Sequence, residues 1–75
     1  MKLYSYTDRR GWRRLFINLN NVLDYATEDV TAVLGYKHTT HHHKQIGDYV
    51  YVYFETEYGV ETSAEAIIHI VETED

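Results

Sequence analysis

The run Asp-Tyr-Val-Tyr-Val-Tyr-Phe-Glu at 48–55 constrains the fold more than any other part of this chain. β-branched and aromatic residues fill it without interruption, which predicts a β-strand. Tyr49, Tyr51 and Tyr53 would face one way, and the Val and Phe side chains between them the other way. A strand with two apolar faces is normally covered on both sides, and a small domain has few elements to do this. We therefore expect the tyrosine face to contact another subunit or a ligand; coverage by a helix of the same chain is the alternative.

The length of 75 residues predicts a single domain over 1–75. Its stability should be marginal, because so short a chain buries only about 60% of the surface that it exposes when unfolded. The absence of cysteine excludes disulfides, thiolate chemistry and cysteine zinc sites, and suits a cytoplasmic protein. No apolar run is long enough for a membrane span, and the amino terminus lacks a signal-type stretch, so we expect no membrane partner.

The remaining patterns predict an α+β fold in which a small twisted antiparallel sheet of four to five strands carries one inserted short helix and a C-terminal helix. Alternating residues indicate strands at 2–7 and 12–19, separated by a turn at 8–11. Three asparagines then weaken regular pairing, and 22–25 continue as a short extended or bulged segment. The Glu57-Tyr58-Gly59 turn leads into a short strand at 60–62.

Helix signals begin at Thr27, where a capping hydroxyl and two acidic residues precede apolar positions and Gly35, so we expect a short helix there. Residues 36–47 lack apolar periodicity and are interpreted as an exposed, histidine-rich loop. Thr62 to Glu65 has the spacing of a capping box, so a helix should follow to about residue 71. The β-branched run at 67–71 leaves a last strand as the alternative.

The frame Leu-Phe-Ile-Asn-Leu-Asn-Asn-Val at 15–22, the later Tyr/Val strand and Glu-Ala-Ile-Ile-His-Ile-Val-Glu at 65–72 resemble the small FlbD-type flagellar proteins and similar short phage proteins. That resemblance implies two hairpins, a C-terminal helix and a noncatalytic interaction module, with the helix and histidine-rich loop at 26–47 as an insertion in the domain. The stretch 29–37 resembles part of the BRO-type antirepressor domain of phages, and more loosely the start of a helix-turn-helix. This second resemblance implies DNA binding and a further helix at 39–46.

Four arginines surround an indole and a glycine in the segment Arg9-Arg10-Gly11-Trp12-Arg13-Arg14. Arginine forks match phosphate oxygens, and tryptophan offers a face on which a base can stack, so the segment suits a nucleotide or a nucleic-acid backbone. On a strand Trp12 and Arg14 would share a face while Arg13 points away, so one ligand cannot use all four arginines of one subunit. The alternative is that Trp12 caps the core and the arginines pair with acids. The expected ligand-binding residues are Arg9, Arg10, Trp12, Arg13, Arg14, Tyr49, Tyr51 and Tyr53.

Four histidines, His38, His41, His42 and His43, are weak candidates for a divalent-metal site, because adjacent residues point apart. A solvated loop is the simpler interpretation, with a pH-sensitive contact as a further alternative. Glu55, Glu57 and Glu61 flank a turn, where carboxylates are usually too exposed for acid–base work. We expect no catalytic residue, no cofactor and no enzyme activity.

Charge is strongly segregated along the chain. Through Lys44, seven basic residues stand against four acidic ones, a balance of +3, while the remainder carries eight carboxylates and no Lys or Arg. Such a chain could hold an anion at one end or pair with a copy of itself. We expect a homo-oligomeric binding protein that captures an anionic nucleotide-like ligand, as a sponge or inhibitor; that it is of phage type is what the two resemblances imply. The alternatives are a protein inhibitor that presents its acidic half to a host enzyme, and a small DNA-binding regulator.

Overall fold

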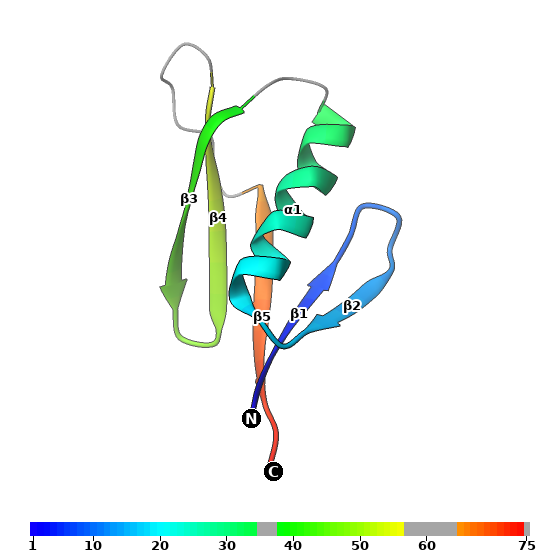
Figure 1. Ribbon diagram of the computed structural model, residues 1–75, viewed down its shortest axis with the longest axis vertical. Helices are drawn as coiled ribbons and strands as arrows, with labels where there is room; N and C mark the ends of the chain where they lie inside the picture. The colour runs from blue at the N-terminus through cyan, green and yellow to red at the C-terminus, as the bar shows by residue number, and fades with distance from the viewer. Residues whose placement is uncertain (35–37, 57–64, 75) are drawn as a thin grey trace.

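The computed structural model describes residues 1–34, 38–56 and 65–74, with the backbone alone at 33–34, 38–41 and 56. Within this part the elements follow in the order β1 (Lys2–Thr7), β2 (Arg13–Phe16), α1 (Leu19–Leu34), β3 (His38–Ile46), β4 (Tyr49–Thr56) and β5 (Ala66–Glu72). The five strands form one antiparallel sheet in the order β2-β1-β5-β4-β3, and α1 lies across one face of it (Figure 1). The predicted α+β class with a small antiparallel sheet is confirmed.

The last strand occupies the centre of the sheet. β5 pairs with β1 on one side and with β4 on the other, and hydrogen bonds from the Thr73 N–H and from the amino terminus of Met1 join Met1 to Thr73 just beyond the strands. The two ends of the described chain therefore lie side by side (Figure 1). Because β5 and β4, from the acidic half, lie between β1 and β3, which come almost wholly from the basic half, the charge segregation along the sequence does not become two separate poles.

Helix α1 begins eight residues earlier than the predicted start at Thr27. Asn18 is its N-cap: the side-chain oxygen accepts a hydrogen bond from the Asn20 N–H at 2.8 Å. The sequence interpretation took the asparagines only as residues that weaken strand pairing, and it predicted an extended segment at 22–25. That prediction is wrong, because these residues lie in α1. Thr27 lies inside the helix, where its hydroxyl donates to the Leu23 carbonyl at 2.7 Å instead of capping a terminus.

The histidine-rich segment is a strand and not a loop, at least over the described residues 38–46. It pairs with β4 in a hairpin whose two central residues are Gly47 and Asp48, with Ile46 opposite Tyr49. Gly47 has a φ of +61°, and Asp48 has no positive φ, as in a type II′ turn, which suits the twist of a two-residue hairpin. The predicted helix at 39–46 is therefore also wrong, and the helix-turn-helix arrangement does not form.

The segment 66–72 is a strand, so the predicted C-terminal helix is wrong and the alternative is correct. Ala66, Ile68 and Ile70 are buried, while Ile67 and His69 between them are exposed, which is the period of two of a sheet. β-branched residues fit this environment better than a helix. The predicted turn at 57–59 and strand at 60–62 lie outside the described residues.

One core fills the space between α1 and the sheet. Val22, Ala26 and Val30 of α1 are fully buried, as are the β4 side chains Val52 and Phe54. The predicted alternation of β4 is confirmed, because the Val and Phe side chains enter this core while the tyrosines lie on the opposite face. Among the described helical residues, no helix is long and apolar enough to cross a membrane.

Candidate functional site

The four predicted arginines lie in the connection between β1 and β2 or at the start of β2. We call residues 8–14 the Arg/Trp hairpin. The Gly11 N–H donates to the Asp8 carbonyl at 3.0 Å, and the Asp8 N–H donates to the Trp12 carbonyl at 2.9 Å. Gly11 has a φ of +87°, a left-handed conformation that favours glycine. Asp at the first position and Gly at the fourth are typical of a type I turn followed by a bulge.

The Asp8 carboxylate fixes this hairpin from within. One of its oxygens accepts the N–H groups of Arg10 at 3.0 Å and Trp12 at 2.9 Å, and the other accepts the Tyr25 hydroxyl of α1 at 2.8 Å. The Trp12 N–H, together with the Tyr25 hydroxyl and the Arg10 N–H, holds the pKa of Asp8 below its ordinary value against the opposing effect of burial. The hydrogen bond to Asp8, with burial, raises the pKa of Tyr25.

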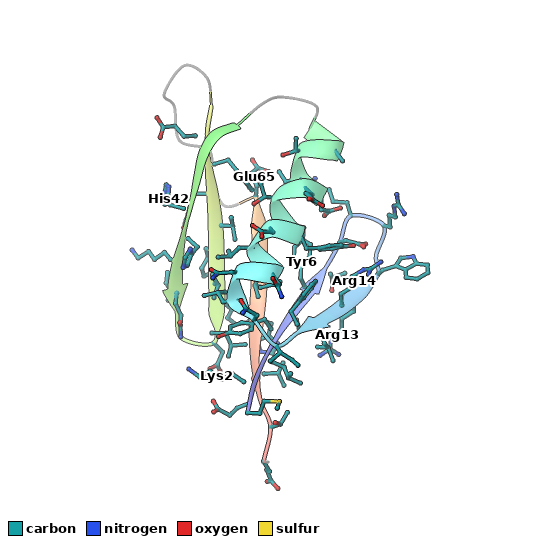
Figure 2. The ribbon with its side chains drawn as sticks, in the orientation of Figure 1. Lys2, Tyr6, Arg13, Arg14, His42 and Glu65 are labelled. Carbon is teal, nitrogen blue, oxygen red and sulfur yellow. The ribbon has the colours of Figure 1, made fainter. Side chains whose placement is uncertain are left out.

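A second hydrogen-bonded pair of a tyrosine and a carboxylate, Tyr6 and Asp29, joins β1 to α1. Tyr6 lies between β1 and α1 (Figure 2), and its hydroxyl donates to Asp29 at 2.7 Å. The same Asp29 oxygen accepts the Arg9 N–H at 3.2 Å. Burial, followed by the hydrogen bond to Asp29, raises the pKa of Tyr6 above its ordinary value. The rings of Tyr6 and Tyr25 meet edge to face at 5.9 Å, so the two pairs form one connected cluster.

The four arginines have four different environments. Arg9 approaches Glu65 with an N–O distance of 3.6 Å, which is an ion pair of the kind that the alternative interpretation expected. Arg14 lies over the Tyr25 ring, 5.0 Å from its centre, on the helix side of the sheet. Arg13 donates to the Ser5 hydroxyl at 2.8 Å on the other side. Arg10 is exposed in the turn. The predicted division between Arg13 and Arg14 is confirmed.

The indole of Trp12 does not cap the core, because its side chain is 66% exposed. Among the described residues, the guanidinium groups of Arg10, Arg13 and Arg14 make no ion pair. The hairpin therefore presents cations and an aromatic face to solvent, on a backbone that Asp8 and Tyr25 hold in place.

The predicted tyrosines lie elsewhere. Tyr49, Tyr51 and Tyr53 are on the sheet face opposite α1, which we call the open face, because no described element covers it. Of the predicted arginines, Arg13 is on this face, while Arg14 points to the helix side. The predicted set of eight ligand-binding residues is thus divided into two surfaces, the Arg/Trp hairpin and the open face.

Aromatic rings on the open face stack against one another. The ring centres of Tyr49 and His69 are 4.9 Å apart with planes 18° from parallel, and those of His42 and Tyr53 are 5.4 Å apart at 17°. Each pair joins neighbouring strands. Rings stacked along the sheet surface stand upright on it, so they present their edges outward.

Two of the histidines that were weak candidates for metal binding, His42 and His43, lie on opposite faces of β3. His42 lies opposite Tyr53, and His43 lies opposite Val52 on the other side of the strand. No group of three or more potential metal ligands occurs among the described side chains, which do not include those of His38 and His41. Glu55 is half-buried at the end of β4, whereas Glu57 and Glu61 lie outside the described residues.

Sequence reasoning missed the residues that fix the hairpin, Asp8, Tyr25 and Asp29. Asp8 was recognised only as part of a turn, although Asp three residues before Gly is a signal for a turn in which the carboxylate accepts backbone N–H groups. Tyr25 and Asp29 are four residues apart, which places them on one face of a helix once α1 is extended back to Leu19.

Comparisons with protein-family models, with curated proteins and with solved structures found no match. The resemblances to FlbD-type proteins and to the BRO-type antirepressor domain therefore stay predictions, and the site is interpreted from its own chemistry.

Proposed function

We propose that this chain is a non-catalytic binding protein that captures an anionic, nucleotide-like ligand at the Arg/Trp hairpin. The observation that carries the proposal is the exposed indole of Trp12 beside arginines that make no ion pair with a described carboxylate. Arg10 and Arg14 are the ligand arginines in this proposal, with Arg13 at the margin.

Two kinds of group on one hairpin match the two parts of a nucleotide. A guanidinium group donates paired hydrogen bonds to phosphate oxygens, and stays charged at any physiological pH. An indole face stacks on any nucleobase, with about 1–3 kcal/mol per stacked base. The protein as a whole has a net charge of −5, so a local cluster of cations is needed to attract an anion.

Rigidity of the hairpin supports capture. The Asp8 carboxylate accepts three hydrogen bonds, two from the turn itself and one from α1. A surface that is already ordered loses less conformational entropy when a ligand binds. Stoichiometric capture of this kind suits a phage-type sponge acting in the cytoplasm, which lowers the free concentration of a nucleotide without changing it chemically.

Intrinsic fluorescence offers a direct test, because Trp12 is the single tryptophan of the chain. Nucleoside mono-, di- and triphosphates, a short single-stranded oligonucleotide and inorganic phosphate would each be titrated into the protein. We expect saturable quenching by nucleotides that weakens as salt is added. Arg10→Ala and Arg14→Ala should each weaken binding by about 10-fold or more, because each removes a charge-assisted hydrogen bond worth about 1.5–3 kcal/mol.

Lys2→Ala is the matched control, since it removes an exposed cation at the far end of β1 (Figure 2). Binding by this variant should equal that of the wild type. The proposal fails if no nucleotide quenches Trp12 at millimolar concentration, or if the Lys2 variant loses as much affinity as the arginine variants.

The two alternatives have less support. Of the carboxylates in the acidic half, Glu65 faces Arg9, and three others lie outside the described residues, so no acidic surface is defined for an inhibitor. The hypothesis of a DNA-binding regulator requires a second helix at 39–46, but residues 38–46 form β3.

A further inference from the structure

The open face has the layout of a protein interface. Its middle consists of aliphatic, aromatic and small polar side chains from the three inner strands, including Ile67, His69, Tyr49 and Tyr51, and holds no described Asp, Glu, Lys or Arg. Ile67 is 50% exposed and Tyr49 is 43% exposed, and on the flanking strands Leu15 and Ile46 are more than half exposed. Large apolar side chains gathered on one side of a small protein are typical of a surface that another protein covers.

Charged residues lie only at the margins of this face, among the described side chains. Arg13 is on β2 and Lys44 is on β3, the two edge strands, and Glu55 is near the end of β4. An interface with an apolar, aromatic centre and a charged rim is the usual arrangement in protein complexes, because a charge in the centre would be desolvated without compensation.

The area is sufficient for a stable pair. The five strands average about seven residues in length, and each residue covers roughly 16 Å² of a sheet, from a strand spacing of about 4.8 Å and a rise of about 3.3 Å. One open face therefore has on the order of 500 Å² of flat area. Two such faces together remove about 1,000 Å² or more from water, which is the lower limit for a specific interface.

Ring orientation favours a protein over a nucleobase as the occupant. The stacked pairs Tyr49–His69 and His42–Tyr53 stand upright on the sheet and present ring edges. Bases need exposed ring faces, whereas upright side chains on two sheets can interdigitate as they do in a β-sandwich, with the sheets about 10 Å apart.

From these observations we infer that the occupant is a second copy of this chain, which packs its open face against that of the first in a two-fold homodimer. The centre holds no described Asp, Glu, Lys or Arg that would repel its equivalent in the second copy, and a twofold pair buries the same patch on both subunits. This arrangement gives a chain of 75 residues a second core, on the sheet face that α1 leaves uncovered. The dimer does not depend on the proposed ligand site, which lies on the hairpin.

Mass in solution tests the inference. Light scattering after gel filtration at about 100 μM should give twice the chain mass of 8.9 kDa. Ile67→Lys places a charge in the centre of the open face without touching the core under α1, and should raise the dimer dissociation constant by at least about 100-fold. His43→Lys, on the helix side of β3 and exposed, is the matched control and should stay dimeric.

Circular dichroism must show that the Ile67 variant keeps its strands and helix. If it does not, Tyr49→Lys on β4 provides the same test from another strand. A wild-type mass of 8.9 kDa at this concentration overturns the inference, as does a folded Ile67 or Tyr49 variant that remains dimeric. Ligand quenching of Trp12 is a separate readout, so failure of either proposal is distinguishable from failure of the other.

Discussion

Replacing Tyr6 by phenylalanine removes one oxygen atom and isolates the contribution of the Tyr6–Asp29 pair. The hydroxyl donates to a carboxylate at 2.7 Å, and the side chain is 4% exposed. Hydrogen bonds to charged groups contribute about 1.5–3 kcal/mol. Asp29 keeps the Arg9 N–H at 3.2 Å in the variant, so it is not left without a partner, and we expect a loss of about 2 kcal/mol. For a domain of this size that lowers Tm by about 8–16 °C.

Urea denaturation followed by circular dichroism measures this loss. Tyr4→Phe is the control, because Tyr4 lies on the same face of β1 and packs against the core, but its hydroxyl makes no hydrogen bond with a described residue. A loss below about 0.5 kcal/mol for the Tyr6 variant, or an equal loss for Tyr4→Phe, would refute the reasoning.

The same pair predicts a dependence on alkaline pH. The pKa of Tyr6 is raised in the folded protein, so its contribution to stability is fully present below the unfolded-state pKa of about 10 and is lost as the pH rises beyond that value. Absorbance at 295 nm should show two tyrosines, Tyr6 and Tyr25, that ionise only as the protein unfolds. Their ionisation together with the exposed tyrosines in the folded state would contradict this.

Three further substitutions test the hairpin and the core. Asp8→Asn should flatten the acid dependence of stability, because the lowered pKa of Asp8 gives a contribution that is present above about pH 3.9 and is lost as the pH falls, as urea midpoints between about pH 2 and 5 will show. Gly11→Ala should cost about 1–2 kcal/mol from backbone strain alone, since no atom lies within 4 Å of the added carbon. Phe54→Ala, at a fully buried position, should cost about 3–5 kcal/mol in the same denaturation assay.

Much of the sheet could be predicted from local pattern. The strand at 2–7 and the Tyr/Val strand are both confirmed, because alternation and β-branched residues determine strand formation directly. Two errors arose from weighing one signal against another. β5 is a strand because its β-branched residues favour a strand more than the capping-box spacing before it favours a helix. β3 is a strand despite its polar composition because it pairs with β4. Gly47-Asp48 between two runs was an available hairpin signal that was not used.

The candidate site was less accessible to sequence reasoning, because it depends on which elements meet. The opposite directions of Arg13 and Arg14 followed from strand alternation. The exposure of Trp12 was not predicted, because a core-capping indole was left open as the alternative. The separation of the tyrosines from the arginines could not be predicted in this way, because it results from β1 and β5 lying between β2 and β4. The hydrogen bond from Tyr25 to Asp8 could have been predicted only if the full extent of α1 had been known.

The central position of β5 has a consequence for how the chain acquires its structure. The pairs β1–β2 and β3–β4 join segments close in sequence and can assemble as soon as each has been made, whereas β5 must reach both and join them. Such long-range closure is slow relative to local pairing. Because an isolated two-stranded hairpin is only marginally stable, neither pair should persist by itself, and the whole sheet should become stable in one cooperative step when β5 joins them.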